Sequence, residues 1–166
     1  HQATANWGFT CSIAALIVAV ISPLLGAVAD FKGAKKKFMA FFVFLGVTAT
    51  ALLYFVKTGD WKLASALYIF GNIGFAGSLV FYDALLPHIT TSEEIDQVSS
   101  RGFAMGYIGG GLLLAINLAM IMVVPNYFPD MDPTLMSRLS FASVAIWWLV
   151  FTIPAMRYIS EPPRKI

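Results

Sequence analysis

Charge is scarce in this sequence. Only 12% of the 166 residues are Asp, Glu, Lys or Arg, whereas 58% are hydrophobic. Soluble domains are typically about 45–50% apolar and about 25% charged, and a water-soluble chain of this size could not bury so much apolar surface. A bilayer removes that constraint. Because the charges are also clustered, they leave charge-free runs of membrane-spanning length, and the composition predicts a polytopic membrane protein.

Cysteine and histidine are nearly absent. Cys11 is the only cysteine, which excludes an internal disulfide and a thiolate metal cluster, and we expect it to be a buried apolar residue. His1 and His88 have no partner at metal-ligand spacing. The sequence also lacks a nucleophile elbow, a phosphate loop and a paired-carboxylate site. We therefore expect no enzyme activity, no cofactor and no metal. The net charge of only +2 argues against a nucleic-acid partner.

Five apolar segments of membrane-spanning length are present. They cover residues 7–29, 38–56, 63–86, 102–124 and 139–158. A spanning helix needs roughly 20 apolar residues, so each segment predicts one crossing. The expected fold class is an all-α, polytopic transmembrane helix bundle, with a single transmembrane domain over residues 1–166.

Lysine and arginine are distributed unequally between the two ends of these segments. One end has eight of the eleven, which are Lys32, Lys35, Lys36, Lys37, Arg101, Arg157, Arg164 and Lys165. The other end has Lys57, Lys62 and Arg138. Since cytoplasmic loops carry an excess of basic residues, the eight-residue end is predicted to be cytoplasmic. The aromatic residues Trp7, Tyr54, Trp61 and Tyr127 fall near the opposite interface, where an aromatic belt is expected.

The densest charge lies in the connector GAVADFKGAKKK, residues 26–37. Its lysines orient the chain and attract anionic lipid, so membrane lipid is an expected partner. Gly26 favours a close helix approach, and Gly33 suits a tight turn. Asp30 is predicted to end its helix, where the dipole disfavours an anion, and it therefore calls for a cationic or amide partner. An ordinary positive-inside loop explains the lysines but not the Gly–Asp–Gly spacing.

That spacing resembles the signature G-x-x-x-D-R-x-G-R-K between helices two and three of major facilitator superfamily transporters. The matching residues are Gly26, Asp30, Gly33 and Lys35 or Lys36. Phe31 and Ala34 stand where the superfamily has arginine. The resemblance implies a gate loop whose aspartate pairs across to the other half of the transporter.

A longer resemblance covers about residues 7–120. It is carried by WGFTCSIAALIVAVISPLLGAVAD, GNIGFAGSLVFYDALLPHI and VSSRGFAMGYIGGGLLL, which resemble the vacuolar-effluxer-like branch of the superfamily, the autophagy-related amino-acid effluxers. The resemblance implies a partial N-terminal half of a major facilitator fold, helices two to six of twelve, with the first helix and the C-terminal half outside this chain. It also implies a bacterial inner membrane or a vacuolar-type membrane.

Polar side chains of the third segment share one helix face. At about 100° per residue, Asn72 and Asp83 lie about 20° apart, and Tyr68 lies about 40° from Asn72. Ionisable residues inside a membrane commonly mark functional sites. Asp83 either tunes ion or proton coupling in a cavity, or it is hydrated or paired near the cytoplasmic interface. The resemblance implies that this helix lines the central cavity, with Asn usual in place of Asp83 and without the intramembrane arginine of proton-coupled members.

The fourth segment carries a stripe of small residues, which are Gly102, Gly106, Gly109 and Gly110. Such stripes let helices pack closely. GYIGGG resembles the helix-five motif G-P-x-x-G-G of drug antiporters, with Tyr107 in place of the proline. Asn117 lies about 20° from Gly106, and it either hydrogen-bonds a packed neighbour or contacts substrate.

The polar stretch before the fourth segment predicts a helix of its own. Thr91 and Glu94 have the spacing of a capping box. Ile95 and Val98 lie three residues apart, which predicts a short helix on the cytoplasmic surface.

Two functions of different classes fit this pattern. The first is a secondary active transporter that moves a small solute, with amino acids as candidates, by rocking two halves around a midplane site. The second is a truncated half-transporter that serves as a structural or scaffold membrane subunit. The expected partners are lipid, a small-molecule substrate and the remainder of the transporter or a partner subunit.

Overall fold

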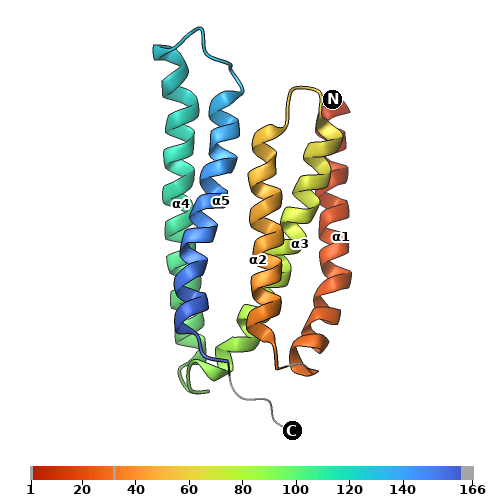
Figure 1. Cartoon of the computed structure of the whole chain (residues 1–166), viewed down its shortest axis with the longest axis vertical. Coiled ribbons are helices and arrows are strands. Elements are labelled where there is room, and N and C mark those ends of the chain that lie inside the picture. Colours follow the sequence, from red (N-terminus) through yellow and green to blue (C-terminus); the bar gives the residue numbers. More distant parts are fainter. Residues whose placement is uncertain (1, 32, 162–166) are drawn as a thin grey trace.

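The computed structural model describes residues 2–31 and 33–161, and within them it is a bundle of long helices (Figure 1). The helices are α1 (Gln2–Phe31), α2 (Lys35–Leu52), α3 (Trp61–Leu85), α4 (Ile95–Tyr127) and α5 (Leu135–Tyr158), with 3-10 turns η1 (Leu53–Phe55) and η2 (Leu86–His88). Each helix is long and apolar enough to cross a membrane. The all-α transmembrane class predicted from the sequence is confirmed. Each predicted apolar segment falls on one helix or on a helix and the 3-10 turn that follows it. Lys32, Arg164 and Lys165 lie outside the described residues.

Turns between the helices occur where the chain breaks helical geometry. Gly59 has φ +99°, which L side chains rarely adopt, and it forms the turn between η1 and α3. Pro87 lies in η2, directly after α3, and its missing backbone N–H cannot continue the hydrogen bonding of that helix. Pro129 and Pro133 occupy the loop between α4 and α5. Successive turns lie at opposite ends of the helices, so the bundle has two distinct ends.

The two ends are named here by a residue that each contains. The Lys35 end carries the α1–α2 connector, η2 and the segment after α5, and the Trp61 end carries the start of α1 and the α2–α3 and α4–α5 loops. In Figure 1 the Trp61 end is at the top, where the N-terminus lies, and the Lys35 end is at the bottom.

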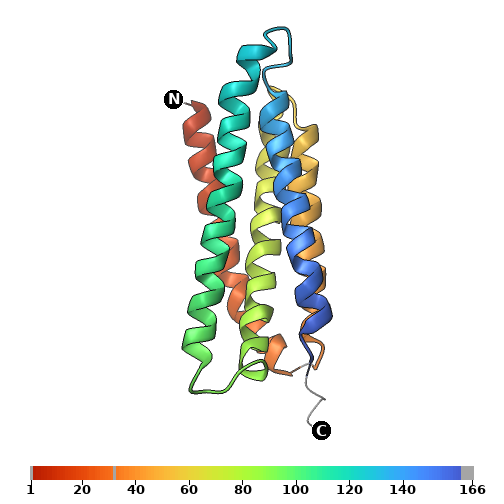
Figure 2. The same ribbon diagram turned by 90° about the vertical axis from the view of Figure 1, so that its left-hand side faces the viewer.

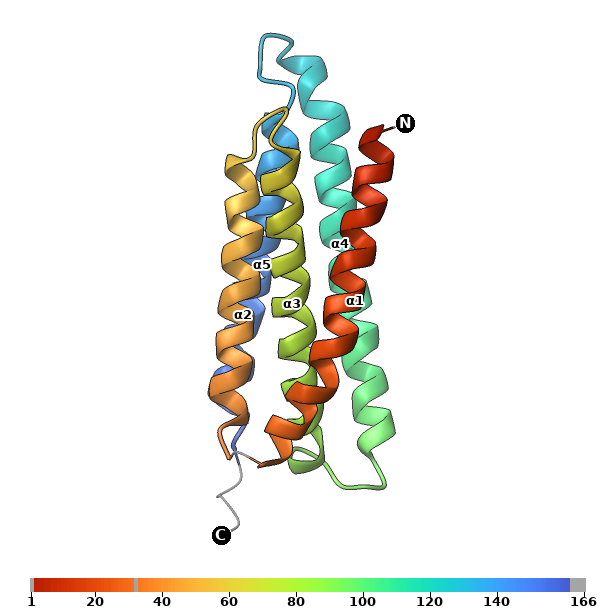
Figure 3. The same ribbon diagram turned by 90° about the vertical axis from the view of Figure 1, so that its right-hand side faces the viewer.

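The helices form two groups, α1–α3 and α4–α5. α3 packs against both α1 and α2, and α5 packs against α2 and α4. Figure 1 shows α4 on the far side of α5 from α2, and Figure 2 and Figure 3, in which α4 and α1 overlap, show all these helices running along the same long axis. The main neighbour of α4 among the described residues is α5. α2 and α3 are therefore the central elements.

The apolar core lies between α2 and α3, toward the Lys35 end. Phe81 and Leu85 of α3 are completely buried there. Met39, Phe42 and Val43 of α2 are buried beside them. The Phe81 ring stacks on Phe42, with ring centroids 5.9 Å apart. Elsewhere many apolar side chains are exposed, as expected for helices whose outer surfaces face lipid.

The start of α4 differs from the sequence prediction. Residues 95–101 are the first turns of α4 and do not form a separate surface helix. Glu94 makes no side-chain capping hydrogen bond, although its N–H donates to the Thr91 carbonyl at 3.2 Å. Residues 95–124 contain no proline that would interrupt the helix, so α4 continues from the polar stretch into the apolar run. The first proline, Pro125, lies inside α4 near its end. At about 1.5 Å per residue, α4 is roughly 50 Å long, longer than a bilayer core.

Candidate functional site

Helix α3 has two opposite faces. Its fully buried side chains, Phe81 and Leu85, lie toward α2. At about 100° per residue, Phe81 is about 180° around the helix from Asn72. The face predicted from the sequence to be polar therefore points away from the apolar core, toward α1.

A cavity of about 460 Å³ lies on that face, between α1 and α3. On both helices the lining residues recur at helical spacing, because one face of each helix turns toward the other. They are Cys11, Ala14, Ala15, Val18 and Ser22 of α1, and Tyr68, Asn72, Phe75, Ala76, Leu79, Val80 and Asp83 of α3. The structure thus brings Tyr68, Asn72 and Asp83 to one cavity.

The cavity has polar groups at both of its ends. Toward the Trp61 end, the Cys11 thiol lies 3.8 Å from the Tyr68 hydroxyl. One turn along α3, Asn72 Nδ2 donates to the Tyr68 carbonyl at 2.9 Å. Toward the Lys35 end, Ser22 and Asp83 line the cavity, and Asp83 is exposed. Cys11 is therefore a half-buried, cavity-lining thiol, and the sequence interpretation of it as a buried apolar residue is wrong.

Asp83 is the one charged side chain among the residues that line this cavity. Its carboxylate can hold a cation or a proton, while the hydroxyl, amide and thiol groups farther along can hydrogen-bond a solute. Tyr68 and Asp83 are 15 residues apart, so the groove is roughly 22 Å long along α3. Such a groove can accommodate a small polar or cationic solute.

The residues of the gate signature lie at the Lys35 end. Asp30 is exposed at the end of α1, and among the described residues no cation comes within 4 Å of its carboxylate. Gly26 has no described atom within 4 Å of an added Cβ, so it makes no close helix contact there. Gly33 lies in the connector, and Lys36 lies in the first turn of α2. A role for these residues at a gate stays a prediction.

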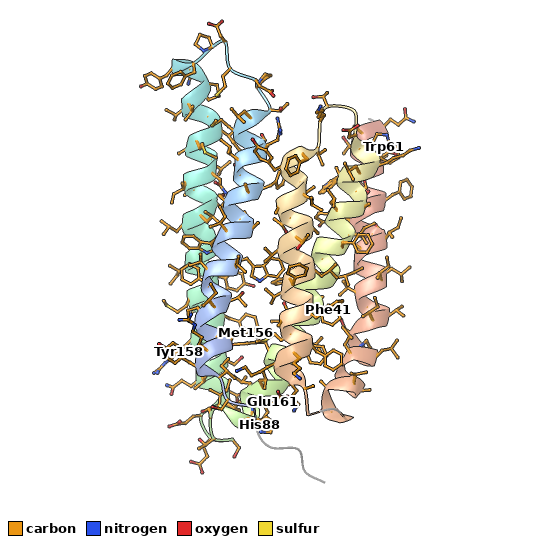
Figure 4. The ribbon with its side chains drawn as sticks, viewed as in Figure 1. Phe41, Trp61, His88, Met156, Tyr158 and Glu161 are labelled. Carbon is orange, nitrogen blue, oxygen red and sulfur yellow. The ribbon has the colours of Figure 1, made fainter. Side chains whose placement is uncertain are left out.

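Lys35 joins three segments that are far apart in the sequence. Its Nζ donates to the Ala84 carbonyl at 3.2 Å and lies 3.3 Å from His88 Nε2. Its backbone N–H donates to the Glu161 carboxylate, which follows α5 and caps the start of α2. Figure 4 shows His88 and Glu161 together at this end. Sequence reasoning missed Glu161, because no local pattern links residues so far apart.

A second tie holds α5 to η1, the turn that follows α2, at the Trp61 end. The guanidinium of Arg138 lies over the Tyr54 ring, 4.6 Å from its centroid, and its Nε donates to the Tyr54 carbonyl. Arg138 also pairs with Asp132 at 3.5 Å. Arginine suits such a site because its planar group can stack and donate at once.

The glycines of α4 contact the other described helices less closely than a packing stripe requires. An added Cβ on Gly106 or Gly110 would meet no described atom within 4 Å. One on Gly102 would lie 3.1 Å from the Tyr82 hydroxyl, and one on Gly109 would lie 3.7 Å from Trp147. Close packing by Gly106 and Gly110 therefore stays a prediction about surfaces beyond the described residues.

The tight glycine contacts are instead between α2 and α3. An added Cβ on Gly74 would lie 2.4 Å from the backbone nitrogen of Gly46, and one on Gly77 would lie 2.4 Å from the Phe42 ring. Sequence reasoning missed this seam. The three-residue spacing of Gly71, Gly74 and Gly77 was the available signal.

Asn117 lies away from the α1–α3 cavity. It is 7% exposed on α4, and the Ser143 hydroxyl of α5 hydrogen-bonds its Oδ1 at 3.0 Å. This geometry is that of a polar contact between packed helices, the first of the two roles considered from the sequence. A substrate contact has no support in the cavity lining.

A second hollow lies at residues 127–131. It measures about 310 Å³ and lies in the α4–α5 loop, with Asp130 as its charged residue. It lies at the end of the helices, whereas the α1–α3 cavity runs along them. The α1–α3 cavity is therefore the candidate functional site.

Long apolar helices, an all-α bundle and a polar groove between two of the helices define an integral, multi-pass membrane protein. Residues 2–165 match the family described as Vacuole effluxer Atg22 like. The chain belongs to this family, in agreement with the resemblance seen in the sequence.

Curated relatives come from bacteria and fungi. The chain is 40% identical over 160 residues to the uncharacterized MFS-type transporter YxiO of Bacillus subtilis, covering 96% of this chain and 37% of YxiO. It is 24% identical to autophagy-related protein 22-1 of Penicillium rubens, covering 93% of this chain and 36% of that protein. It is 25% identical to autophagy-related protein 22 of Coccidioides immitis, covering 93% of this chain and 33% of that protein. The chain thus spans about a third of the length of these relatives. No solved structure matches it.

Proposed function

We propose that this chain is part of a secondary transporter of the major facilitator type, and that the groove between α1 and α3 lines the path of a small solute. The observation that carries the proposal is the cavity of about 460 Å³, whose lining combines Tyr68, Asn72 and a single charged group, Asp83. An isolated carboxylate on a membrane helix is costly, and such groups typically lie on substrate or ion pathways.

The names of the relatives support transport as the function. YxiO is described as an MFS-type transporter, and the matching family is described as a vacuole effluxer family. These names describe transport proteins and not enzymes. Amino acids are the first solutes to test, because the autophagy-related effluxers that the sequence resembles release amino acids. A zwitterion could place its ammonium group at Asp83, while its carboxylate would need a partner outside this groove.

The arrangement in the membrane follows from the distribution of basic residues. We place the Lys35 end on the cytoplasmic side, because cytoplasmic loops are enriched in lysine and arginine. The higher identity to a bacterial relative than to fungal ones favours a bacterial inner membrane over a vacuolar-type membrane. In this orientation Asp83 lies near the cytoplasmic end of the groove.

In this proposal, the remainder of the transporter supplies the helices that alternating access requires. Alternating access needs two halves that rock against each other. We assign the first helix and the C-terminal half to sequence outside this chain, where they would cover the groove. Asp30, exposed at the Lys35 end, would then find its cationic or amide partner on the other half.

The test is uptake by the complete gene product in proteoliposomes, screened first with radiolabelled amino acids at several pH values. Asp83→Asn removes the charge and keeps the side-chain size. We expect it to flatten the pH dependence of uptake, because the group that binds the coupling proton or cation is gone. Asp130→Asn is the matched control: it makes the same chemical change in the exposed α4–α5 loop and should leave the pH profile unchanged.

The possible outcomes separate the two functions considered. An identical pH profile for Asp83→Asn and the parent would remove Asp83 from coupling but would leave transport standing. Absence of uptake for every solute by correctly folded, complete protein would favour the structural or scaffold subunit. A protein whose natural chain ended near residue 166 would favour the same alternative.

A further inference from the structure

The groove between α1 and α3 has one of its ends toward the Trp61 end of the bundle. Its last lining residues there are Cys11 and Tyr68. One helical turn before Cys11, the ring of Trp7 packs on the ring of Tyr68, with centroids 4.6 Å apart and planes inclined by 57°. Trp7 does not line the cavity, whereas Tyr68 does, so Trp7 packs on the last lining residue of α3 from outside the cavity.

The helices at this level are held together by polar contacts. The Thr10 and Ser65 hydroxyls are hydrogen-bonded at 2.9 Å, and Thr10 is only 4% exposed. Tyr68 is contacted from the cavity side by the Cys11 thiol at 3.8 Å. The backbones of α1 and α3 are thus closely apposed here, and Tyr68 is supported on one side by Cys11 and on the other by Trp7.

Trp7 itself is less constrained than Tyr68. It is 49% exposed, so about half of its surface makes no contact with the described residues. A tilted aromatic pair of this kind contributes only a weak interaction. Its free energy favours the paired rings over the separated rings by about two- to tenfold. The pair is therefore strong enough to be the main conformation and weak enough to open.

We propose that Trp7 is a lid, which closes the Trp61 end of the α1–α3 groove by packing on Tyr68 and opens it by rotating away. In the closed position the ring pair separates the Cys11 thiol and the rest of the groove from water at that end. Because the groove is the solute path in the proposed function, the lid would control entry from the side opposite Asp83. The purpose of the lid rests on the proposed function, but the experiment that tests the lid does not.

Cys11 is a native reporter of this lid, because it is the only cysteine of the chain and its thiol lies 3.8 Å from the Tyr68 hydroxyl. The experiment measures how fast a membrane-impermeant maleimide labels Cys11 when it is added on the side of the Trp61 end. The complete protein is used in sealed, oriented vesicles, with any cysteine outside residues 1–166 replaced by serine. A membrane-permeant maleimide, measured in parallel, corrects for differences in thiol reactivity.

Four variants separate the lid from simpler explanations. W7A removes the ring, and we expect about two- to tenfold faster labelling by the impermeant reagent relative to the permeant one. W7F keeps an aromatic ring and should stay near the parent rate. F9A truncates an aromatic side chain that is 69% exposed on the same helix, outside the pair, and should also stay near the parent rate. W7L keeps bulk without the aromatic pair, and it replaces W7A as the test if W7A does not fold.

The outcomes are decisive in both directions. Faster labelling in W7A or W7L but not in F9A supports the lid. An unchanged ratio in both Trp7 variants, or an equal rise in F9A, overturns it. The labelling assay needs no transported solute. A protein that transports normally with an unchanged labelling ratio would therefore refute the lid alone, and one that shows the lid but no uptake would refute the transport function alone.

Discussion

Helix α3 meets its two neighbours in opposite ways. Toward α2 it presents Gly74, Gly77 and Phe81, and the backbones approach so closely that an added Cβ on Gly74 would fall 2.4 Å from the Gly46 nitrogen. Toward α1 it presents polar side chains around a cavity of about 460 Å³. Both neighbours are apolar helices of similar composition, so hydrophobicity alone does not explain the difference.

Side-chain size and polarity do explain it. Glycines let two helices approach until dispersion contacts become continuous, which is how helices associate where no hydrophobic effect drives them together. On the other face, the bulk of Tyr68 and Phe75 and the polarity of Asn72 and Asp83 keep α1 from closing the space. One helix can therefore hold the bundle together on one side and leave room for a ligand on the other.

The largest effect is expected on the packed face. Gly74→Ala places a Cβ against the backbone of α2, where nothing can rotate away, and we expect a loss of about 1–3 kcal/mol in stability. Thermal unfolding in detergent measures the change. Gly110→Ala is the control, because its Cβ meets no described atom within 4 Å and alanine is the better helix former. Equal melting temperatures for the two variants would contradict the contrast between the faces.

An intermediate effect is expected where α5 is tied to the packed side of the bundle. Glu161→Ala removes the acceptor for the Lys35 N–H at the start of α2. Losing a cap of this kind costs about 0.5–2 kcal/mol. Glu161→Gln keeps an acceptor oxygen and should lose less. Unfolding of both variants, with Glu93→Ala in the exposed η2–α4 loop as a control, tests the order. If Glu93→Ala lowered stability as much as Glu161→Ala, the tie would have no special role.

The smallest effect lies outside the helices, at Asp132. Its Oδ1 accepts hydrogen bonds from the Thr134 N–H at 2.8 Å and the Thr134 hydroxyl at 2.7 Å. The Thr134 backbone N–H, then the Thr134 hydroxyl, and then the nearby Arg138 lower the pKa of Asp132 below its ordinary value of 3.8. The stabilisation from the charged form is therefore fully present above that value and is lost as the pH falls through the lower, folded pKa.

Asp132→Asn tests this pH dependence, since asparagine can still accept from Thr134 but carries no charge. We expect the parent to be slightly more stable than the variant near neutral pH, and the difference to vanish below the folded pKa. Melting temperatures of both proteins across the acid range measure it. A difference that stayed constant with pH would mean that the carboxylate charge contributes nothing.

Local patterns predicted much of this architecture. The apolar runs located all five helices, and helical periodicity placed Tyr68, Asn72 and Asp83 on one face of α3. Two predictions went wrong through local reasoning alone. The polar stretch that contains Ile95 and Val98 was expected to form a separate helix, but nothing in it ends the helix before the apolar run. Cys11 was taken for an apolar core residue because its neighbour Tyr68 could not be identified from the sequence.

The sequence by itself determined the class of protein, the number of apolar helices and the polar face of α3, because composition and helical periodicity are properties of consecutive residues. Only the tertiary structure decided which helix covers each face of α3. It alone revealed the close contact of Gly46 with Gly74, the pairing of Trp7 with Tyr68 and the tie between Lys35 and Glu161. These are contacts between residues far apart in the chain, and they depend on how the helices pack, which no local pattern encodes.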